Sequence, residues 1–189
     1  MKKRLSNKWL ITAVLLLCVV IIIYLLAVPL LVDRNALRAG LGTPLDELTD
    51  KYTPEQAATD GCLVVNGSDV IAGKDQWKLF RLKTTLHIPA AIRICTFYST
   101  GDPWINDLTY DGREYGLHHP NRPSNYARYL KFSKATNPYG GGFEGQNKYY
   151  LSTTTDGSWD EYMSSILSSS YPMELDYKVY LLFSEWALP

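Results

Sequence analysis

Histidine and cysteine are scarce in this chain, and their scarcity limits the chemistry available to it. The 189 residues contain only three of each, and none has the spacing of a zinc site. The signatures G-x-S-x-G and H-E-x-x-H are also missing, so no local motif of a serine hydrolase or a zinc protease is present. We therefore expect neither a metal site nor a bound cofactor.

The motifs of phosphate-binding and calcium-binding loops are missing as well. The glycine-rich stretch 135–147 has Phe143 and Glu144 after its glycines, where a phosphate-binding loop has Lys and then Ser or Thr. The acidic residues near position 160 lack the twelve-position ligand loop of an EF-hand. Asp160 and Glu161 are better explained by the start of a helix.

An excess of basic residues is lacking too. Lys and Arg together number 19, as do Asp and Glu, so the formal net charge is zero. Four bases, at positions 2, 3, 4 and 8, precede every acidic residue, and nineteen minus four leaves fifteen bases against nineteen acids in the remainder. We expect no nucleic-acid partner, because capture of a phosphate backbone needs clustered Lys and Arg.

One long apolar run, WLITAVLLLCVVIIIYLLAVPLLV, extends from Trp9 to Val32. As a helix it would measure about 36 Å, against roughly 30 Å for a hydrocarbon core. A cleaved signal peptide has a shorter core and small residues at its cleavage site, whereas residues 30–32 are Leu, Leu and Val. Lipidation at Cys18 is disfavoured because a leucine precedes it. The run predicts an uncleaved transmembrane signal anchor over residues 9–32.

The flanking charges predict how such an anchor would be oriented. The basic residues 1–8 would form a cytoplasmic tail by the positive-inside rule, with residues from 33 onward outside. The predicted location is the cell membrane, crossed once, with the membrane as the partner of residues 9–32. Residues 33–51 contain scattered charges, two glycines and a proline, and are interpreted as a tether to an extracytoplasmic domain, residues 52–189.

The domain begins with a short helix whose two ends are both encoded. Thr53 with Gln56 forms a capping box, Pro54 suits the first helical position, and Gly61 suits a left-handed stop. Periodicity then predicts further helices over 74–87 and 158–170, and strands over 62–65, 90–98, 104–110, 126–134, 148–155 and 177–183. This order predicts an α+β domain with a mostly antiparallel sheet and helices packed on one face, preceded by one transmembrane helix.

The stretch STGDPWINDLTYDGREYGLHH, residues 99–119, contains the densest group of candidate catalytic side chains: Asp102, Asp107, His118 and His119. The dipeptide Asp111-Gly112 between two alternating runs predicts a β-hairpin with a two-residue type I′ turn. Asp107 would then point outward. His118 and His119 would lie on opposite faces and could not share a metal. The hairpin is the simpler interpretation, and the four residues are weak catalytic candidates.

Cys62 and Cys95 form the one cysteine pair outside the apolar run. In an oxidising compartment they could close a disulfide loop of about 33 residues, worth a few kcal/mol. Two buried thiols are the alternative, and the sequence leaves both open.

Two segments of the C-terminal half carry further predictions. Tyr139 and Phe143 in the glycine-rich stretch are candidates for a recognition loop. A long, loosely packed hairpin turn without a binding role is the simpler interpretation. In the helix at 158–170, an apolar stripe at helical spacing predicts core positions. Its members are Trp159, Tyr162, Met163, Ile166 and Leu167.

Several of these motifs together resemble a known domain family. The run YTPEQAATDGCLVVNG, the Gly101-Asp102-Pro103 turn and the Tyr110-Asp111-Gly112 turn are similar to the DUF4362-like domain of Firmicutes surface proteins, over roughly residues 52–132. Cys62 stands where that pattern has an acidic residue, and the C-terminal helix and strand are not part of it. The resemblance implies a membrane- or lipid-anchored protein of a Gram-positive envelope, and it implies no particular chemistry.

These observations favour a binding or structural module at the cell envelope. Fourteen tyrosines and five tryptophans are consistent with a surface that binds a peptide, a glycan or an envelope protein. The alternative is a small envelope hydrolase whose site is assembled from distant residues.

Overall fold

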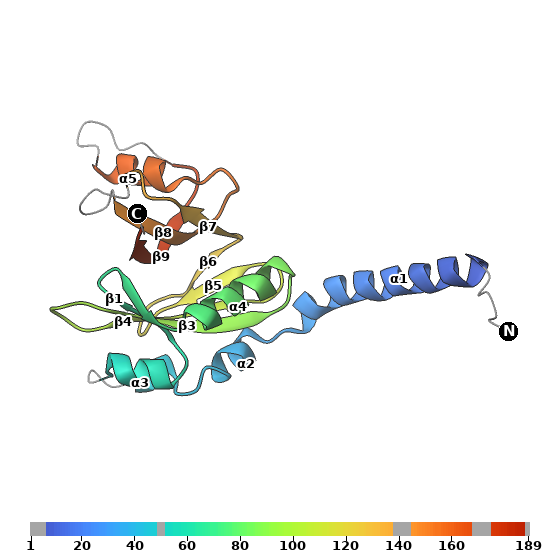
Figure 1. The fold of residues 1–189 in the computed structure, drawn as a ribbon, viewed down its shortest axis with the longest axis horizontal. Helices are drawn as coiled ribbons and strands as arrows, with labels where there is room; N and C mark the ends of the chain where they lie inside the picture. Colours follow the sequence, from blue (N-terminus) through green and yellow to red (C-terminus); the bar gives the residue numbers. More distant parts are fainter. Residues whose placement is uncertain (1–6, 49–51, 138–144, 168–174, 188–189) are drawn as a thin grey trace.

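The structure is a computed structural model that describes residues 7–48, 52–137, 145–167 and 175–187. It has an α+β architecture with two sheets, a larger one of six strands and a smaller one of three. Figure 1 shows the smaller sheet lying over one face of the larger one. Helix α1 (Asn7–Leu31) extends away from both.

The larger sheet is mixed, with the strand order β2-β1-β3-β4-β5-β6. Its strands are β1 (Leu63–Asn66), β2 (Asp69–Ala72), β3 (Ala90–Phe97), β4 (Trp104–Tyr110), β5 (Tyr115–His118) and β6 (Asn125–Ala127). The pair β1 and β3 is parallel, and the other neighbouring pairs are antiparallel. Parallel neighbours need a long connection, which β2 and helix α4 (Lys74–Thr85) provide.

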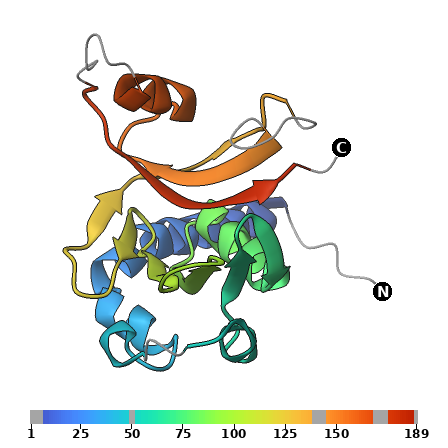
Figure 2. The same cartoon turned by 90° about the vertical axis from the view of Figure 1, so that its left-hand side faces the viewer.

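The smaller sheet is antiparallel, with β8 (Gln146–Ser152) between β7 (Tyr129–Ser133) and β9 (Val179–Trp186). Helix α5 (Trp159–Leu167) lies on its outer side (Figure 2). Tyr150 and Val179 on that side form a small buried cluster with Trp159. The antiparallel pairing predicted from the alternation in 126–134 and 148–155 is present between β7 and β8, but the predicted first strand is divided, because Asn125–Ala127 form β6 of the larger sheet.

Helices cover both faces of the larger sheet, so the prediction of one sheet with helices on a single face is wrong. The main core lies between this sheet, α4 and the smaller sheet, and includes Trp77, Phe80, Leu108 and Phe183. A second cluster lies on the opposite face, under helix α3 (Pro54–Thr59) and the 3-10 turn η1 (Leu45–Glu47). Apolar side chains lie on both faces of these strands, so both faces need a cover.

The segment expected to be a tether is folded against the larger sheet over residues 33–48. It forms helix α2 (Arg34–Ala39), capped by the Asp33 side chain, and then η1. Arg34 donates hydrogen bonds to Asp111 at 2.5 Å and to Glu114 at 3.1 Å, and Leu45 is buried. The charged residues that suggested a flexible linker are therefore docking contacts.

The apolar N-terminal run forms a helix that stands apart from the rest of the chain. The side chains of α1 are described from Trp9 to Ile23, and all of them are exposed. Over the described residues, no helix is both long and apolar enough to cross a membrane. This finding overturns the prediction of a transmembrane signal anchor over residues 9–32.

Local signals predicted two further elements, one of them with an error in detail. The capping box of α3 is present in both directions between Thr53 and Gln56. The hairpin β4–β5 also forms, but its turn spans four residues rather than two, because Tyr110 pairs with Tyr115. Gly112 has positive φ, and the Asp111 carboxylate accepts hydrogen bonds from the backbone N–H groups of residues 113 and 114. A capped four-residue turn thus replaces the predicted type I′ turn.

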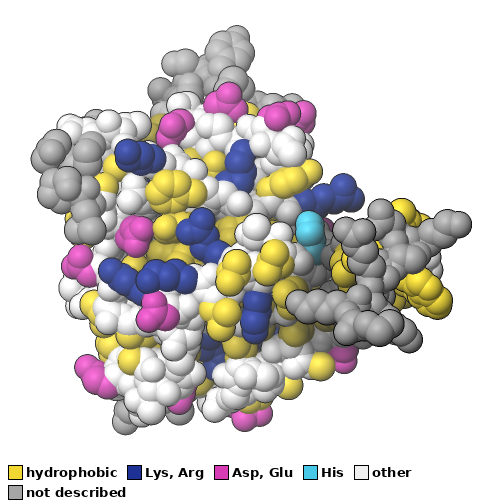
Figure 3. Space-filling view, turned by 45° about the vertical axis from the view of Figure 1, so that its right-hand side comes forward, with side chains coloured by type: hydrophobic (Ala, Val, Ile, Leu, Met, Phe, Trp, Pro, Cys, Tyr) yellow, Lys and Arg dark blue, Asp and Glu magenta, His cyan; other side chains and the backbone are white. Residues whose placement is uncertain are grey.

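The outer surface is mixed in character. On the face that Figure 3 presents, Lys and Arg side chains are interspersed with apolar side chains and with some acidic ones. On α5, Trp159 is buried, but Ile166 and Leu167 are 58% and 74% exposed. The prediction that the whole apolar stripe of this helix is core is therefore wrong at its C-terminal end.

Candidate functional site

Several polar side chains that the sequence singled out lie in a row across the face of the larger sheet that α2 and α3 cover. Arg93 on β3 donates to both carboxylate oxygens of Asp107 on β4, at 2.7 and 3.1 Å, and each residue is at most 3% exposed. Arg38 of α2 lies 3.8 Å from the same carboxylate. Asp107 was predicted to point outward, and it is instead the acidic partner of a buried ion pair. Burial of such a charge requires a partner of this kind.

His118 is the next member of this polar row, directly across from Asp107 in the β4–β5 register. Its Nδ1 lies 2.8 Å from Ser124 Oγ, and its Nε2 lies 3.0 Å from Thr109 Oγ1. The ring needs the glycine at position 116, because a Cβ there would come within 2.8 Å of Nε2. Burial lowers the pKa of His118 to about 4. The imidazole is therefore neutral at pH 7 and is a weak base.

The four catalytic candidates do not meet at one point. Asp107 and His118 share the α2-covered face, whereas His119 belongs to the opposite face, as the alternation predicted. Asp102 is exposed in the loop before β4. His118 hydrogen-bonds hydroxyl groups through both nitrogens, so no carboxylate orients it as in a Ser-His-Asp arrangement.

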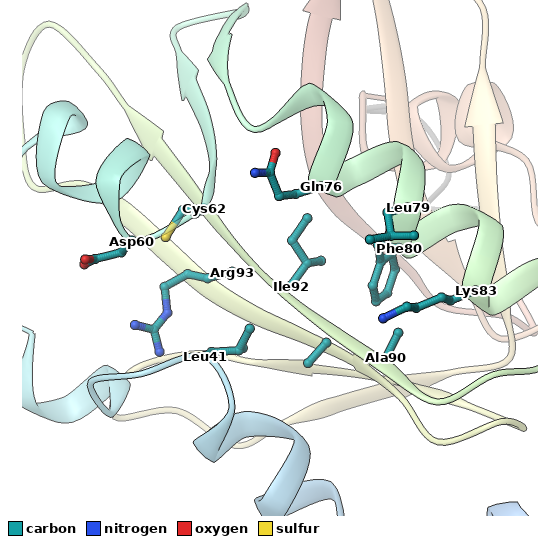
Figure 4. A pocket seen from close by; sticks show the side chains of 12 residues that line it. Leu41, Asp60, Cys62, Gln76, Leu79, Phe80, Lys83, Ala90, Ile92 and Arg93 are labelled. Atoms are coloured by element: carbon teal, nitrogen blue, oxygen red, sulfur yellow. The ribbon is translucent and has the colours of Figure 1, made fainter.

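Cys62, directly before β1, and Cys95, on the neighbouring parallel strand β3, are free, buried thiols. A hydrogen bond from the Cys95 thiol lowers the pKa of Cys62, and the Tyr52 hydroxyl lies 3.7 Å from its sulfur. Figure 4 shows Cys62 beside Arg93. Both residues line a cavity of about 150 Å³, which extends to Gln76 and Lys83 of α4. The guanidinium of Arg93 is already paired with Asp107, so Arg93 itself is not free to bind an anionic ligand in this cavity.

A different arrangement surrounds Trp104, the first residue of β4. With the amide of Asn106 oriented so that its oxygen faces the indole, Trp104 Nε1 donates to it at 2.6 Å. The amide nitrogen then donates to His119 Nδ1 at 2.5 Å. The His119 ring meets the indole edge-on at 5.8 Å, and the Arg122 guanidinium lies 5.4 Å from the indole centroid. Burial and the charge of Arg122 lower the pKa of His119.

Trp104 is held in place and yet is 45% exposed. Asn106, which holds it, is 1% exposed, so the hydrogen bond comes from a rigid part of the sheet. On one side the indole borders a pocket of about 160 Å³ with His119, Pro120 and Arg122. A large aromatic ring fixed in this way is suited to contact a ligand without losing conformational entropy on binding.

On its other side Trp104 borders a larger cavity of about 490 Å³ between the two sheets, which we call the Trp104 cleft. Tyr98, 55% exposed, and Trp104 come from the β3–β4 end of the larger sheet, and Leu181 comes from β9. The full lining is Gly67, Ser68, Thr96, Tyr98, Trp104, Gln146, Leu181, Leu182, Phe183 and Ser184. The cleft is mostly apolar and aromatic, with a few uncharged polar groups, which is the usual character of a ligand site.

The local sequence pattern does not reveal this site. Trp104 was recognised only as a strand residue, and the aromatic excess was noted without a location. The proposed recognition residues Tyr139 and Phe143 lie outside the described residues. Within those residues, no group of three or more His, Cys, Asp or Glu side chains could hold a metal ion.

Comparison of the chain with protein-family models, curated proteins and solved structures gives no match. The resemblance to the DUF4362-like domain therefore stays a prediction. The assignment of a function depends on the geometry of the site alone.

Proposed function

We propose that this protein is a binding module, with the Trp104 cleft as its ligand site. The observation that carries the proposal is that a half-exposed tryptophan is fixed by a buried asparagine at the mouth of an aromatic cavity. An exposed aromatic ring that served only the fold would not need a buried hydrogen-bond partner to orient it. Fixed aromatic anchors are the residues that dominate binding energy at protein surfaces.

The size and chemistry of the cleft limit what it binds. A volume of about 490 Å³ is within the range of small-ligand and peptide pockets. Among the described residues no charged side chain lines it, so its ligand is an uncharged group or segment that presents apolar surface to Tyr98 and Trp104. Peptides and glycans both meet this description.

The proposal is tested by screening the purified full chain against two probe sets. These are a phage-displayed library of linear twelve-residue peptides and an array of immobilised glycans. A mild detergent is included, because the exposed apolar side chains of α1 favour aggregation. We expect ligands from one set that bind the wild type and bind Trp104→Ala at least tenfold more weakly.

Phe132→Ala is the matched control, since Phe132 is a 47% exposed aromatic residue of β7 outside the cleft lining. It should bind the same ligands as the wild type does. Failure of both probe sets, or equal binding by wild type and Trp104→Ala, would contradict the proposal.

A further inference from the structure

Strand β9 has one edge without a strand partner among the described residues. β8 pairs with the opposite edge, and β9 ends the order β7-β8-β9. At its C-terminal end, Trp186 N–H donates to Ser68 O at 3.0 Å, whereas Ala187 N–H donates to Gly145 O at 2.9 Å, beside the start of β8. Trp186 therefore directs its backbone groups away from β8, and residue 187 directs its N–H towards it.

This alternation determines where the next backbone groups point. Backbone N–H and C=O groups in an antiparallel strand point to alternate sides, so Ser184 directs its groups the same way as Trp186. Ser184 and Ser68 both line the Trp104 cleft. Ser68, in the turn between β1 and β2, thus occupies the pairing position at Trp186. The cleft begins at the next pairing position along this edge, which is Ser184.

A β-bulge shapes the edge that faces the cleft. Phe183 pairs with Tyr149 and Leu181 with Tyr150, which leaves Leu182 as the extra residue of β9. Leu182 and Phe183 are both 3% exposed, whereas Leu181 is 41% exposed and lines the cleft. Bulges often re-aim side chains next to binding sites. Here the bulge places an aliphatic side chain beside an open strand edge.

The four consecutive residues 181–184 form one wall of the cleft, and Tyr98 and Trp104 belong to its opposite side. At roughly 3.3 Å per residue, this wall offers about 13 Å of strand edge. A glycan would use the aromatic side but would leave the directional backbone groups of the edge without a matching partner. An extended backbone matches both the edge and the aromatic side.

We propose that the Trp104 cleft binds an extended, uncharged peptide segment of another protein, which adds to β9 as a further strand along residues 181–184. The inference rests on the proposed binding function and specifies its ligand. Backbone pairing with the strand edge provides affinity, and side chains of the added strand that alternate in direction contact Trp104 and Tyr98. This is the mode of β-strand addition.

The test uses the peptide with the strongest Trp104-dependent binding from the library, synthesised in versions that carry a single N-methyl group at each amide in turn. N-methylation removes one backbone donor. An added strand presents alternate amides to β9, so methylation at every second position should weaken binding at least tenfold and methylation between them should have an effect below threefold. A flat or irregular profile overturns strand addition while leaving the binding function intact.

Two variants of the protein test the same inference. Leu181→Lys should weaken peptide binding at least tenfold, because a cation at the open edge blocks strand pairing. Ile71→Lys is its control, since Ile71 is 54% exposed on β2, the edge strand of the other sheet. Ser184→Pro should also abolish binding, because it removes the N–H that faces the cleft and spares the ladder with β8. Its thermal unfolding is measured in parallel to show that it folds.

The outcomes are distinguishable. Trp104-dependent glycan binding without any peptide overturns the inference and supports the binding function. Loss of binding in Ile71→Lys as well as Leu181→Lys overturns the assignment to β9. If the chain itself dimerises in sedimentation, and Leu181→Lys abolishes the dimer, then the added strand is a second copy and the commitment to another protein is wrong.

Discussion

The two faces of the larger sheet are stabilised by different means. The face toward α4 and the smaller sheet is apolar, with Trp77, Phe80 and Leu108 packed in one cluster. The face toward α2 and α3 carries the buried pair Arg93–Asp107 and the buried His118. Both faces exclude water to a similar degree, so burial alone does not distinguish them.

The two faces differ in the kind of contact that the elements covering them must provide. Apolar side chains need only a partner of suitable shape and volume. A buried ion pair needs each of its charges matched, because removal of one partner leaves a desolvated charge. Helix α2 contributes Arg38 near Asp107 and Arg34 to the β4–β5 turn, so its position is fixed by charge as well as by packing. The polar face should therefore be the one that single substitutions disrupt most.

The largest effect is expected for Asp107→Ala. The substitution leaves the 3% exposed guanidinium of Arg93 without its carboxylate, and loss of one member of a buried pair costs about 3–5 kcal/mol. Urea denaturation would measure the free energy of unfolding. Asp102→Ala removes a carboxylate from the exposed loop between β3 and β4, and it should change stability by less than about 0.5 kcal/mol.

Replacement of both partners separates charge from packing. The double variant Arg93→Met, Asp107→Leu should recover most of the loss, because apolar pairs of similar volume are often as stable as buried ion pairs. A double variant as unstable as Asp107→Ala would show that the Arg93–Asp107 pair stabilises the fold by more than neutralising its own two charges.

Leu108→Ala should have the next largest effect, on the opposite face of the same strand. Leu108 is fully buried, and deletion of a buried leucine side chain costs about 2–5 kcal/mol through lost transfer energy and the resulting cavity. Leu86→Ala, at a 55% exposed position, is the control. An effect of Leu108→Ala larger than that of Asp107→Ala would reverse the proposed ranking of the two faces.

Sequence reasoning was reliable where a few adjacent residues determine the structure. The capping box of α3 and the Asp111-Gly112 hairpin were both found, because each depends on residues within four positions. The placement of His118 and His119 on opposite faces also followed from local alternation.

Prediction from the sequence failed where segments far apart in the chain determine whether a side chain is buried. Asp107 is buried because Arg93, fourteen positions earlier, and helix α2 cover it, and neither is visible in the local pattern around it. The Trp104 cleft requires β9, which is separated in sequence from Trp104 by β5, β6, β7, β8 and α5. The same reason explains why segment 33–48 was mistaken for a tether: its acceptors Asp111 and Glu114 lie far along the chain.

A pH titration sharpens the comparison, because the polar face contains the buried imidazole of His118, whose pKa is strongly lowered. The pKa of His118 is about 4 in the folded chain, below the ordinary value of 6.5. Between these values the unfolded chain binds the extra proton, so the free energy of unfolding should fall by up to about 1.4 kcal/mol for each unit that pH drops from 6.5 toward 4. Above pH 6.5 this contribution is fully present.

Chemical denaturation at a series of pH values would measure the slope. His118→Gln should reduce this slope, since glutamine does not titrate. Equal slopes in the wild type and His118→Gln would show that His118 does not carry the acid sensitivity.

The smallest effect is expected at the N-terminus of α3, which covers the thiols Cys62 and Cys95. Thr53→Ala removes the cap that accepts from Gln56 N–H, at a cost of about 1 kcal/mol. If α3 opens locally, this loss should accelerate the reaction of the two buried thiols with a thiol reagent roughly fivefold. Thr85→Ala on α4, at an exposed position of the opposite face, should leave the rate unchanged.

The same experiment distinguishes buried thiols from the disulfide that the sequence left open. The exposed Cys18 should react fast in every variant and serves as the internal reference. Two further thiols that react slowly, and faster in Thr53→Ala, correspond to the free pair in the structure. If Cys18 alone reacts under native conditions and after unfolding in denaturant without reductant, the pair is oxidised, and the polar face is then held by a covalent bond as well as by charge.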